Sequence, residues 1–227
     1  MPEPVKRSEY VVLVPQKSLS AAKTRLRSVF SQDARREFTL ELLRRTLALC
    51  ASIPDKAGFF LCGDNDVADL ATEYGADLLG GGAGGMRRDI ALAAEDWRIF
   101  GNAAMLIVSA DLPLLTLEDL AAVVDAWRAC AHVVLGHDLR GRGTNVMLVY
   151  EPEHFAFCFG EAVGQGSFAS HLSTAQGYGL PVAVVERPGI ALDIDLPVDI
   201  AAFVRDAPDD PLARFAMSRF QESFRFE

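Results

Sequence analysis

The stretch AAMLIVSADLPLLTLEDL, residues 103–120, decides the fold. Its first six residues are largely apolar without alternation, which is typical of a strand covered by helices on both faces. The run stops before Asp111, Pro113 prevents further strand pairing, and Thr116 with Asp119 has the spacing of an N-cap pair. We therefore predict a buried strand with one carboxylate at its carboxyl end, the edge where open α/β sheets bind ligands. A turn cap is the alternative role for Asp111.

On both sides of this strand, short apolar runs alternate with segments of helical periodicity. Such alternation is typical of an α/β protein whose mostly parallel central sheet lies between two layers of helices. We predict this three-layer α/β fold in a single domain, residues 1–227. The expected strands are residues 10–14, 58–62, 76–79, 103–108, 132–136 and 182–186, with one more after the glycine turn at 141–143. The expected helices are residues 31–53, 65–73, 117–127 and 167–172, one through Ile90 and Trp97, and one that begins at Pro197.

Residues 206–227 form a predicted amphipathic tail. Phe215, Met217, Phe220 and Phe224 lie near helical spacing. An apolar stripe of this kind needs a partner, either the domain itself or a second subunit, so a homodimer is one interpretation.

Composition argues against several functions. The net charge of −9 opposes nucleic-acid binding, which needs clustered Lys and Arg. No apolar run approaches the roughly 20 residues that cross a bilayer, and the N-terminus lacks the apolar core of a signal peptide, so we predict no membrane association and a cytoplasmic location. The four cysteines have neither zinc-site nor disulfide spacing. An anionic small substrate still fits if the chain has a local cationic patch or a bound cation.

A cationic patch follows the first predicted strand. Lys17, Lys23, Arg25 and Arg27 lie within eleven residues, where side chains and backbone amides can together hold phosphate oxygens. The P-loop pattern, GxxxxGK followed by Ser or Thr, is absent. A phosphate site and a solvated basic loop are both open from these residues alone.

Two glycine-rich segments are candidates for ligand contact. Residues 80–85 precede Arg87 and are either a nucleotide-contacting loop or a flexible loop. Because no GxGxxG follows the first strand, a dinucleotide-binding dehydrogenase is a poor fit. Residues 160–166 lead into Ser167, which can cap a helix and present its hydroxyl to an anion. Thr144 is another small hydrogen-bonding candidate.

A pair of acids lies late in the chain. Asp193 and Asp195 are expected at the end of an extended segment, before the helix that begins at Pro197. Two acids two residues apart on an extended segment point the same way. With Asp111 they would form a three-carboxylate site for a hard cation such as Mg²⁺, and a charged turn is the alternative.

Five segments together resemble one known family over nearly the whole chain. They occur in the order found in the 2-phospho-L-lactate or phosphoenolpyruvate guanylyltransferases of deazaflavin coenzyme F-420 biosynthesis. The resemblance implies the nucleotide-diphospho-sugar transferase (MobA-like) fold, which agrees with the alternation. The segments are PxKxLxxAKTRL (15–26), ADLPLLTxEDL (110–120), GTN (143–145), GSFxxHL (166–172) and LDIDxPxDI (192–200).

The resemblance also implies roles for particular residues. Lys17, Lys23 and Arg25 match the cationic loop that meets the triphosphate and the acceptor, and the acids at 111, 193 and 195 match those that hold Mg²⁺. Gly85 and Arg87 lie where the family has a nucleotide-contacting GLN motif, so an arginine replaces the asparagine.

Other positions match the part of the family's site that binds the acceptor. These are Thr144, Ser167 and a glycine before the serine. That glycine is either Gly164, in GQGS, or Gly160, which follows Phe159 as in the family's FGxxS.

The reaction implied is attack by an acceptor phosphate on the α-phosphorus of GTP, with release of pyrophosphate. The partners are then GTP, Mg²⁺ and a small phosphorylated carboxylic acid, which is 2-phospho-L-lactate, phosphoenolpyruvate or 3-phosphoglycerate. Two alternatives remain. One is a nucleotidyltransferase of the same fold that uses a sugar phosphate or a molybdopterin. The other is a non-catalytic nucleotide-binding homologue, for which Arg87 is the only support.

Overall fold

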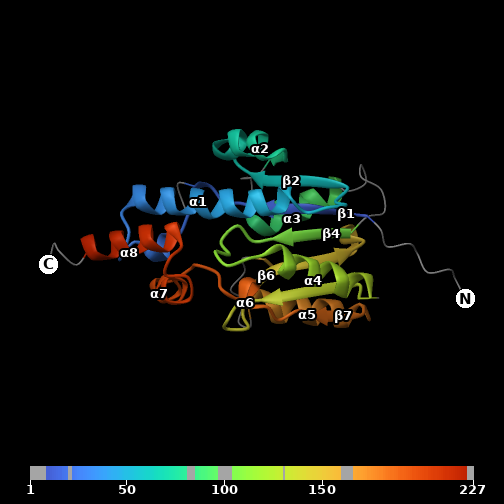
Figure 1. Ribbon diagram of the computed structural model, residues 1–227. Helices are drawn as coiled ribbons and strands as arrows, with labels where there is room; N and C mark the ends of the chain where they lie inside the picture. Colours follow the sequence, from blue (N-terminus) through green and yellow to red (C-terminus); the bar gives the residue numbers. More distant parts are fainter. Residues whose placement is uncertain are drawn as a thin grey trace, which may run out of the picture.

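The computed structural model describes residues 9–19, 22–80, 85–96, 104–129, 131–159 and 166–223. Its strands are β1 (Tyr10–Pro15), β2 (Gly58–Gly63), β3 (Asp77–Gly80), β4 (Ala104–Val108), β5 (Val133–His137), β6 (Thr144–Tyr150) and β7 (Val182–Val184). They form a seven-stranded sheet in the order β3-β2-β1-β4-β6-β5-β7 (Figure 1). β6 is antiparallel to β4 and β5, and the other neighbouring pairs are parallel. The predicted α/β class and mostly parallel sheet are confirmed.

Helices cover both faces of this sheet. α1, α2 and α4 contribute to one apolar cluster against it, and α3 and α5 contribute to the cluster on the opposite face. Of the helices described, none is long and apolar enough to cross a membrane. The helices are α1 (Gln32–Ala51), α2 (Ala68–Tyr74), α3 (Met86–Asp96), α4 (Leu117–Arg128), α5 (Ser167–Gly177), α6 (Pro188–Ala191), α7 (Pro197–Asp206) and α8 (Pro211–Ser223), with short 3-10 turns η2 (Thr24–Leu26), η3 (Asn65–Val67) and η5 (Pro152–His154).

The central strands are apolar on both sides because both faces are buried. In β1, Val12 and Val14 belong to one cluster, whereas Val11 and Leu13 belong to the other. All five residues of β4 are buried. This two-sided burial explains the continuous apolar run with which the fold prediction began.

Several helix starts follow from local sequence. Ser31 caps α1 by accepting the Ala34 N–H at 3.2 Å. Thr116 and Asp119 form a capping box at the start of α4, which begins at Leu117 as predicted. Pro197 is the first residue of α7, also as predicted, because proline suits the first turn of a helix.

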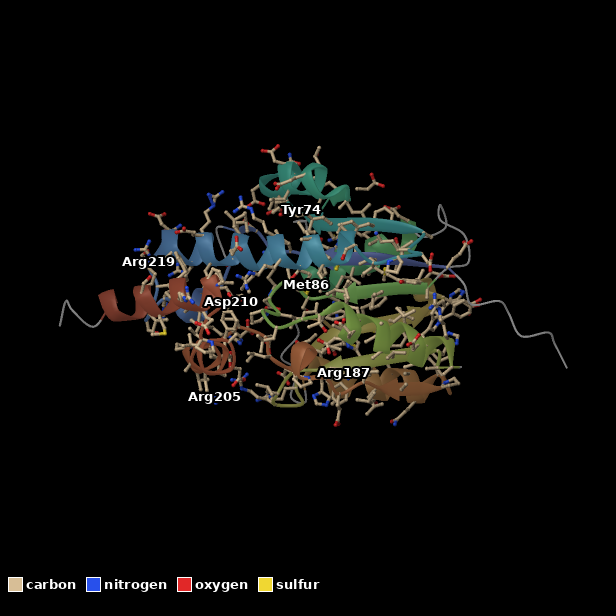
Figure 2. All side chains as sticks on the ribbon, in the orientation of Figure 1. Tyr74, Met86, Arg187, Arg205, Asp210 and Arg219 are labelled. Atoms are coloured by element: carbon tan, nitrogen blue, oxygen red, sulfur yellow. The ribbon has the colours of Figure 1, made fainter. Side chains whose placement is uncertain are left out.

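A third apolar cluster lies beyond the sheet. The amino-terminal half of α1 projects past the strands and packs with α7 and α8 (Figure 1). The rings of Phe38 in α1 and Phe215 in α8 stack with centroids 6.3 Å apart. Arg45 and Asp210, the latter labelled in Figure 2, join α1 to the start of α8 by a 2.7 Å ion pair. The cluster therefore extends the domain past the carboxyl edge of the sheet.

The predicted tail thus packs on its own chain through Phe215. Met217 stays 43% exposed, and Phe220 and Phe224 lie outside the described side chains. The homodimer remains a prediction.

One local expectation is wrong. Asp193 and Asp195 do not end a strand, because β7 stops at Val184 and α6 intervenes. The short helix fits there because Gly189 packs directly on the α4 cap, where a Cβ would overlap Asp119 Oδ2. The acids lie instead in the irregular segment 192–196 between α6 and α7.

Candidate active site

Three distant segments meet at the carboxyl edge of the sheet. β1 and β4 pair in parallel, so the cationic loop after β1 and Asp111 after β4 leave the sheet side by side. The Ile194 N–H donates to the backbone carbonyl of Asp111 at 3.1 Å, which brings the segment 192–196 to the same edge. The predicted convergence of the acids is therefore achieved by a backbone hydrogen bond.

The three acids form a compact cluster. One carboxylate oxygen from each of Asp111, Asp193 and Asp195 lies within 4.8 Å of the others. Three convergent carboxylate oxygens are the ligand type of a hard divalent cation, and water or phosphate oxygens can complete its shell. The donor set therefore fits Mg²⁺.

The electrostatics of the cluster favour an added cation. The pKa of Asp193 is raised to about 7, mainly by burial and to a smaller extent by repulsion from Asp111 and Asp195. Burial also opposes ionisation of Asp195, yet Lys23, then Arg25 and Lys17, hold its pKa below the ordinary value. The third carboxylate therefore lacks full charge compensation from the protein.

Lys23 is the counter-ion built into the cluster. Its Nζ donates to Asp111 Oδ2 at 2.5 Å and to Asp195 Oδ1 at 3.1 Å, and only 9% of its side chain is exposed. Burial works against the ammonium, but Asp111 and Asp195 outweigh it and raise the pKa of Lys23. Its backbone adopts a left-handed conformation, φ 51°, which is uncommon for a residue other than glycine.

The other two predicted cations are more exposed. Arg25 Nη1 lies 3.4 Å from Asp195 Oδ2, with 68% of its side chain exposed. Lys17 is exposed at the loop and borders the cavity beside Asp111. Both can therefore move toward an anionic ligand at little cost, whereas Lys23 is fixed.

Asp199 holds the acid segment in place. This side chain is 2% exposed and accepts the backbone N–H groups of Asp195 at 2.9 Å and Leu196 at 2.7 Å. Arg140 from the β5–β6 turn donates to its other oxygen at 2.5 Å. Sequence reasoning assigned Asp199 no role, although it is the last acid of the LDIDxPxDI motif.

Two cavities open at this edge. The first, of about 300 Å³, is lined by the cationic loop, Asp111 and Asp195. The second, of about 710 Å³, is lined by Gly85, Arg87 and a phenylalanine wall at 155–159. Lys17 and Met86 border both, and Met86 is labelled in Figure 2. Gly85 and Arg87 thus belong to the second cavity.

Thr144 and Ser167 meet although 23 residues separate them. The Thr144 N–H donates to Ser167 Oγ at 2.9 Å. Gly166 permits this closure, because its φ is +86° and a Cβ there would overlap the Arg142 carbonyl. The same carbonyl accepts the Phe168 N–H at 3.0 Å.

The prediction that Ser167 caps a helix is wrong. Gly166 is the N-cap residue of α5, and Ser167 is the first residue of the helix. Its Oγ is occupied by the Thr144 N–H and does not receive a helix N–H. Gly160 and Gly164 lie outside the described residues.

Within the described residues the predicted site falls into three groups. Lys23 and Arg25 join the acid cluster, Gly85 and Arg87 line the second cavity, and Thr144 with Ser167 forms a separate pair. Neither Thr144 nor Ser167 is among the described residues that border the two cavities.

Comparisons with solved structures identify the fold. The chain is similar to a protein of Desulfovibrio desulfuricans G20 assigned to the nucleotide-diphospho-sugar transferases, with a TM-score of 0.75, 14% identity, and coverage of 94% of this chain and 97% of that one. The fold is therefore that of the nucleotide-diphospho-sugar transferases, as predicted.

Sequence comparisons define the family. The model described as "Guanylyl transferase CofC like" matches residues 10–209, and the chain belongs to this family of nucleotidyltransferases. It is 33% identical to a phosphoenolpyruvate guanylyltransferase of Sphaerobacter thermophilus, covering 87% of this chain and 94% of the relative. It is 27% identical to a 3-phospho-D-glycerate guanylyltransferase of Colwellia psychrerythraea, covering 83% and 88%. The family predicted from five motifs is confirmed.

Proposed function

We propose that this protein transfers GMP from GTP to the phosphate of a small phosphorylated carboxylic acid in the cytoplasm. Phosphoenolpyruvate is the first candidate acceptor, because the Sphaerobacter relative is named for it, and 3-phosphoglycerate is the second. The observation that carries the proposal is the cluster of Asp111, Asp193 and Asp195 against Lys23, at the edge of an open cavity.

The reaction is a single displacement. A phosphate oxygen of the acceptor forms a bond to the α-phosphorus of GTP, and the bond from that phosphorus to the bridging oxygen of the β-phosphate breaks. Pyrophosphate leaves with the electron pair. Because the acceptor phosphate is already ionised near neutral pH, the protein needs no general base, and positioning with charge neutralisation accounts for catalysis.

The acid cluster supports a bound Mg²⁺ with Asp111, Asp193 and Asp195 as ligands. When bound, Mg²⁺ would neutralise charge on phosphate oxygens. The protein's own cations would act beside it: Lys23 is fixed against two of the carboxylates, whereas Lys17 and Arg25 can reach outward to the leaving pyrophosphate.

Substrate panels test the proposal. We expect pyrophosphate release from GTP only when Mg²⁺ and one of phosphoenolpyruvate, 3-phosphoglycerate or 2-phospho-L-lactate are all present. Glucose 1-phosphate and molybdopterin are the controls for the other acceptors that this fold can use. Turnover with a control acceptor and with none of the three acids would contradict the proposal that the acceptor is a phosphorylated carboxylic acid. Binding of GTP without turnover on any acceptor would favour a non-catalytic homologue.

Metal affinity should depend on pH through Asp193. Its pKa is about 7 in the metal-free protein, because burial and the negative charges of Asp111 and Asp195 raise it. The positive charge of Lys23 lowers this pKa, and repulsion from Asp138 raises it slightly. Below pH 7 this carboxyl is protonated and metal binding must release the proton, so the affinity should fall about tenfold per pH unit there and level off above about pH 8.

Titration calorimetry with Mg²⁺ in buffers of different ionisation enthalpy measures this linkage. We expect release of nearly one proton at pH 6 and almost none at pH 8. The Asp193→Asn variant should bind more weakly and lose the pH dependence. Equal proton release at both pH values in the unchanged protein would contradict the assignment.

Arg87 should influence the choice of nucleotide. It replaces the asparagine of the family's nucleotide loop, and it lines the second cavity beside Lys17. We expect Arg87→Asn to change the ratio of kcat/KM among GTP, ATP and CTP by about tenfold, the size of one hydrogen bond to a charged group, with little change in the acceptor KM.

Arg88→Asn is the matched control, because Arg88 borders the same cavity from the next position. It should leave the nucleotide ratio unchanged. An equal loss for every nucleotide in Arg87→Asn would mean that Arg87 contacts phosphate and not the base.

A further inference from the structure

The irregular segment 192–196 carries two acids of the metal cluster but has no helix or strand of its own to fix it. The chain that leads into it is held by the β5–β6 turn and the start of β6. The Leu139 N–H donates to the Ala191 carbonyl at 2.9 Å, and Asn145 Nδ2 donates to the Ile190 carbonyl at 2.8 Å. The position of the two acids therefore depends on this turn.

The β5–β6 turn is closed around a buried carboxylate. Asp138 is 7% exposed, and its Oδ1 accepts the backbone N–H groups of Arg140 at 3.1 Å and Arg142 at 2.7 Å. The Asp138 N–H in turn donates to the Gly143 carbonyl at 3.1 Å. These bonds fix the backbone from which the Arg140 side chain extends.

Asp199 holds the segment with only one of its two carboxylate oxygens. As the third residue of α7, it accepts the N–H groups of Asp195 and Leu196 with Oδ2. Its Oδ1 accepts from Arg140 Nη2 instead. Because only 3% of the Asp199 side chain is exposed, an unpaired Oδ1 would be costly, and the carboxylate would turn toward another donor. The ion pair with Arg140 therefore fixes the orientation of both oxygens.

A purely electrostatic role for Arg140 would affect a bound metal in the opposite direction. A positive charge near a metal site repels the metal, so its removal should strengthen metal binding. If Arg140 instead orients Asp199, its removal should weaken metal binding, because the backbone of Asp195 loses its fixed direction. The sign of the change in affinity distinguishes the two roles.

We propose that Arg140 is a positioning residue for the metal site: by holding Asp199, it keeps the backbone of Asp195 in the orientation that directs its carboxylate toward the cation. This inference rests on the Mg²⁺ site of the proposed function, but on neither the nucleotide nor the acceptor. The alternative is an ion pair that stabilises the fold and has no effect on the metal.

Electron paramagnetic resonance of Mn²⁺, added to the full chain without nucleotide, measures metal affinity without turnover. We expect Arg140→Met to weaken Mn²⁺ binding about tenfold, a usual loss when a residue that orients a metal ligand is removed. Arg140→Lys should stay within about threefold of the unchanged protein, because it keeps the charge and a donor for Asp199 Oδ1.

Arg142→Met is the matched control, because it removes the same charge from an exposed position in the same turn. It should bind Mn²⁺ as tightly as the unchanged protein or slightly more tightly. Unchanged or tighter Mn²⁺ binding in Arg140→Met would overturn the inference.

A double-variant comparison identifies the route by which Arg140 acts. Asp199→Asn should itself weaken Mn²⁺ binding, because an amide has one oxygen and cannot accept from both Arg140 and the Asp195 N–H with separate oxygens. In this background Arg140→Met should have little further effect. A full tenfold loss that persists in Asp199→Asn would show that Arg140 does not act through Asp199, and the inference would fail.

Amide hydrogen exchange separates positioning from a general loss of stability. In metal-free Arg140→Met, the amides of Asp195 and Leu196 should exchange faster than in the unchanged protein, whereas those of β1 should keep their protection. Equal acceleration in β1 and at Asp195 would mean that Arg140 only stabilises the fold, and this would overturn the inference.

Failure of the proposed function would give a different pattern. If the unchanged protein bound no Mn²⁺, the metal site would be wrong and the role of Arg140 with it. If the Mn²⁺ affinities followed the expected order but no acceptor gave turnover, the transfer of GMP would be wrong and the role of Arg140 would stand.

Discussion

Asp111→Asn should lower kcat about a thousandfold or more while the protein stays folded. The substitution removes one of three clustered carboxylates and the nearest partner of Lys23. A loss of that size corresponds to about 4 kcal/mol of transition-state stabilisation, near the upper end for removal of one electrostatic contact in a preorganised site. Rates of pyrophosphate release at saturating GTP, Mg²⁺ and acceptor measure it.

The fold should tolerate Asp111→Asn because the side chain is 26% exposed and lies in the turn after β4, outside the apolar clusters. The same change should lower the pKa of Asp193, since Asp111 is one of the charges that raise it. Asp206→Asn, at an exposed acid on α7, is the control for general charge effects. A rate for Asp111→Asn within tenfold of the unchanged protein would make Asp111 a turn residue.

Lys23→Met should reduce both activity and stability. The variant keeps an unbranched apolar side chain that ends at Cε, where the lysine carries Nζ, and it leaves Asp111 and Asp195 without their buried partner. We expect kcat to fall at least about a hundredfold, as for loss of one preorganised charge contact. The free energy of unfolding should fall by roughly 1–3 kcal/mol, less than for a fully buried pair because the carboxylates remain partly exposed.

Mg²⁺ should restore part of the stability lost in Lys23→Met, because a second cation at the cluster replaces the missing charge. Arg25→Met is the matched control: Arg25 contacts the same Asp195 from a largely exposed position, so its loss should leave stability nearly unchanged. Thermal unfolding with and without Mg²⁺ separates these cases. Equal behaviour of the two variants would show that the buried position of Lys23 has no special role.

Local patterns were sufficient for much of the fold. The unbroken apolar run of β4 and the Thr116–Asp119 cap could be recognised because each depends on neighbouring residues. The antiparallel direction of β6 could not be recognised from the sequence, because a strand buried on both faces has the same apolar pattern whichever way it runs. α6 was missed because GIALDID reads as extended, although Pro188 is a helix-start residue.

The site was harder to predict where its contacts are distant in sequence. The three acids could be grouped because each lies in a recognisable motif. Asp199 and His171 also lie in motifs, but Asp199 contacts Arg140, 59 residues away, and His171 contacts Cys158, 13 residues away. Spacing carries no information about such partners, and only the folded chain shows which backbone groups these side chains hold.

The transfer of GMP to the acceptor's phosphate is tested most directly with phosphoenolpyruvate or 3-phosphoglycerate labelled with oxygen-18 in the phosphate group. The enzyme is incubated with unlabelled GTP and Mg²⁺, and both products are analysed by mass spectrometry. If the acceptor phosphate attacks the α-phosphorus, all of the label should appear in a guanylylated acid and none in pyrophosphate. Labelled pyrophosphate, or GMP with no guanylylated acid, would contradict the proposed reaction.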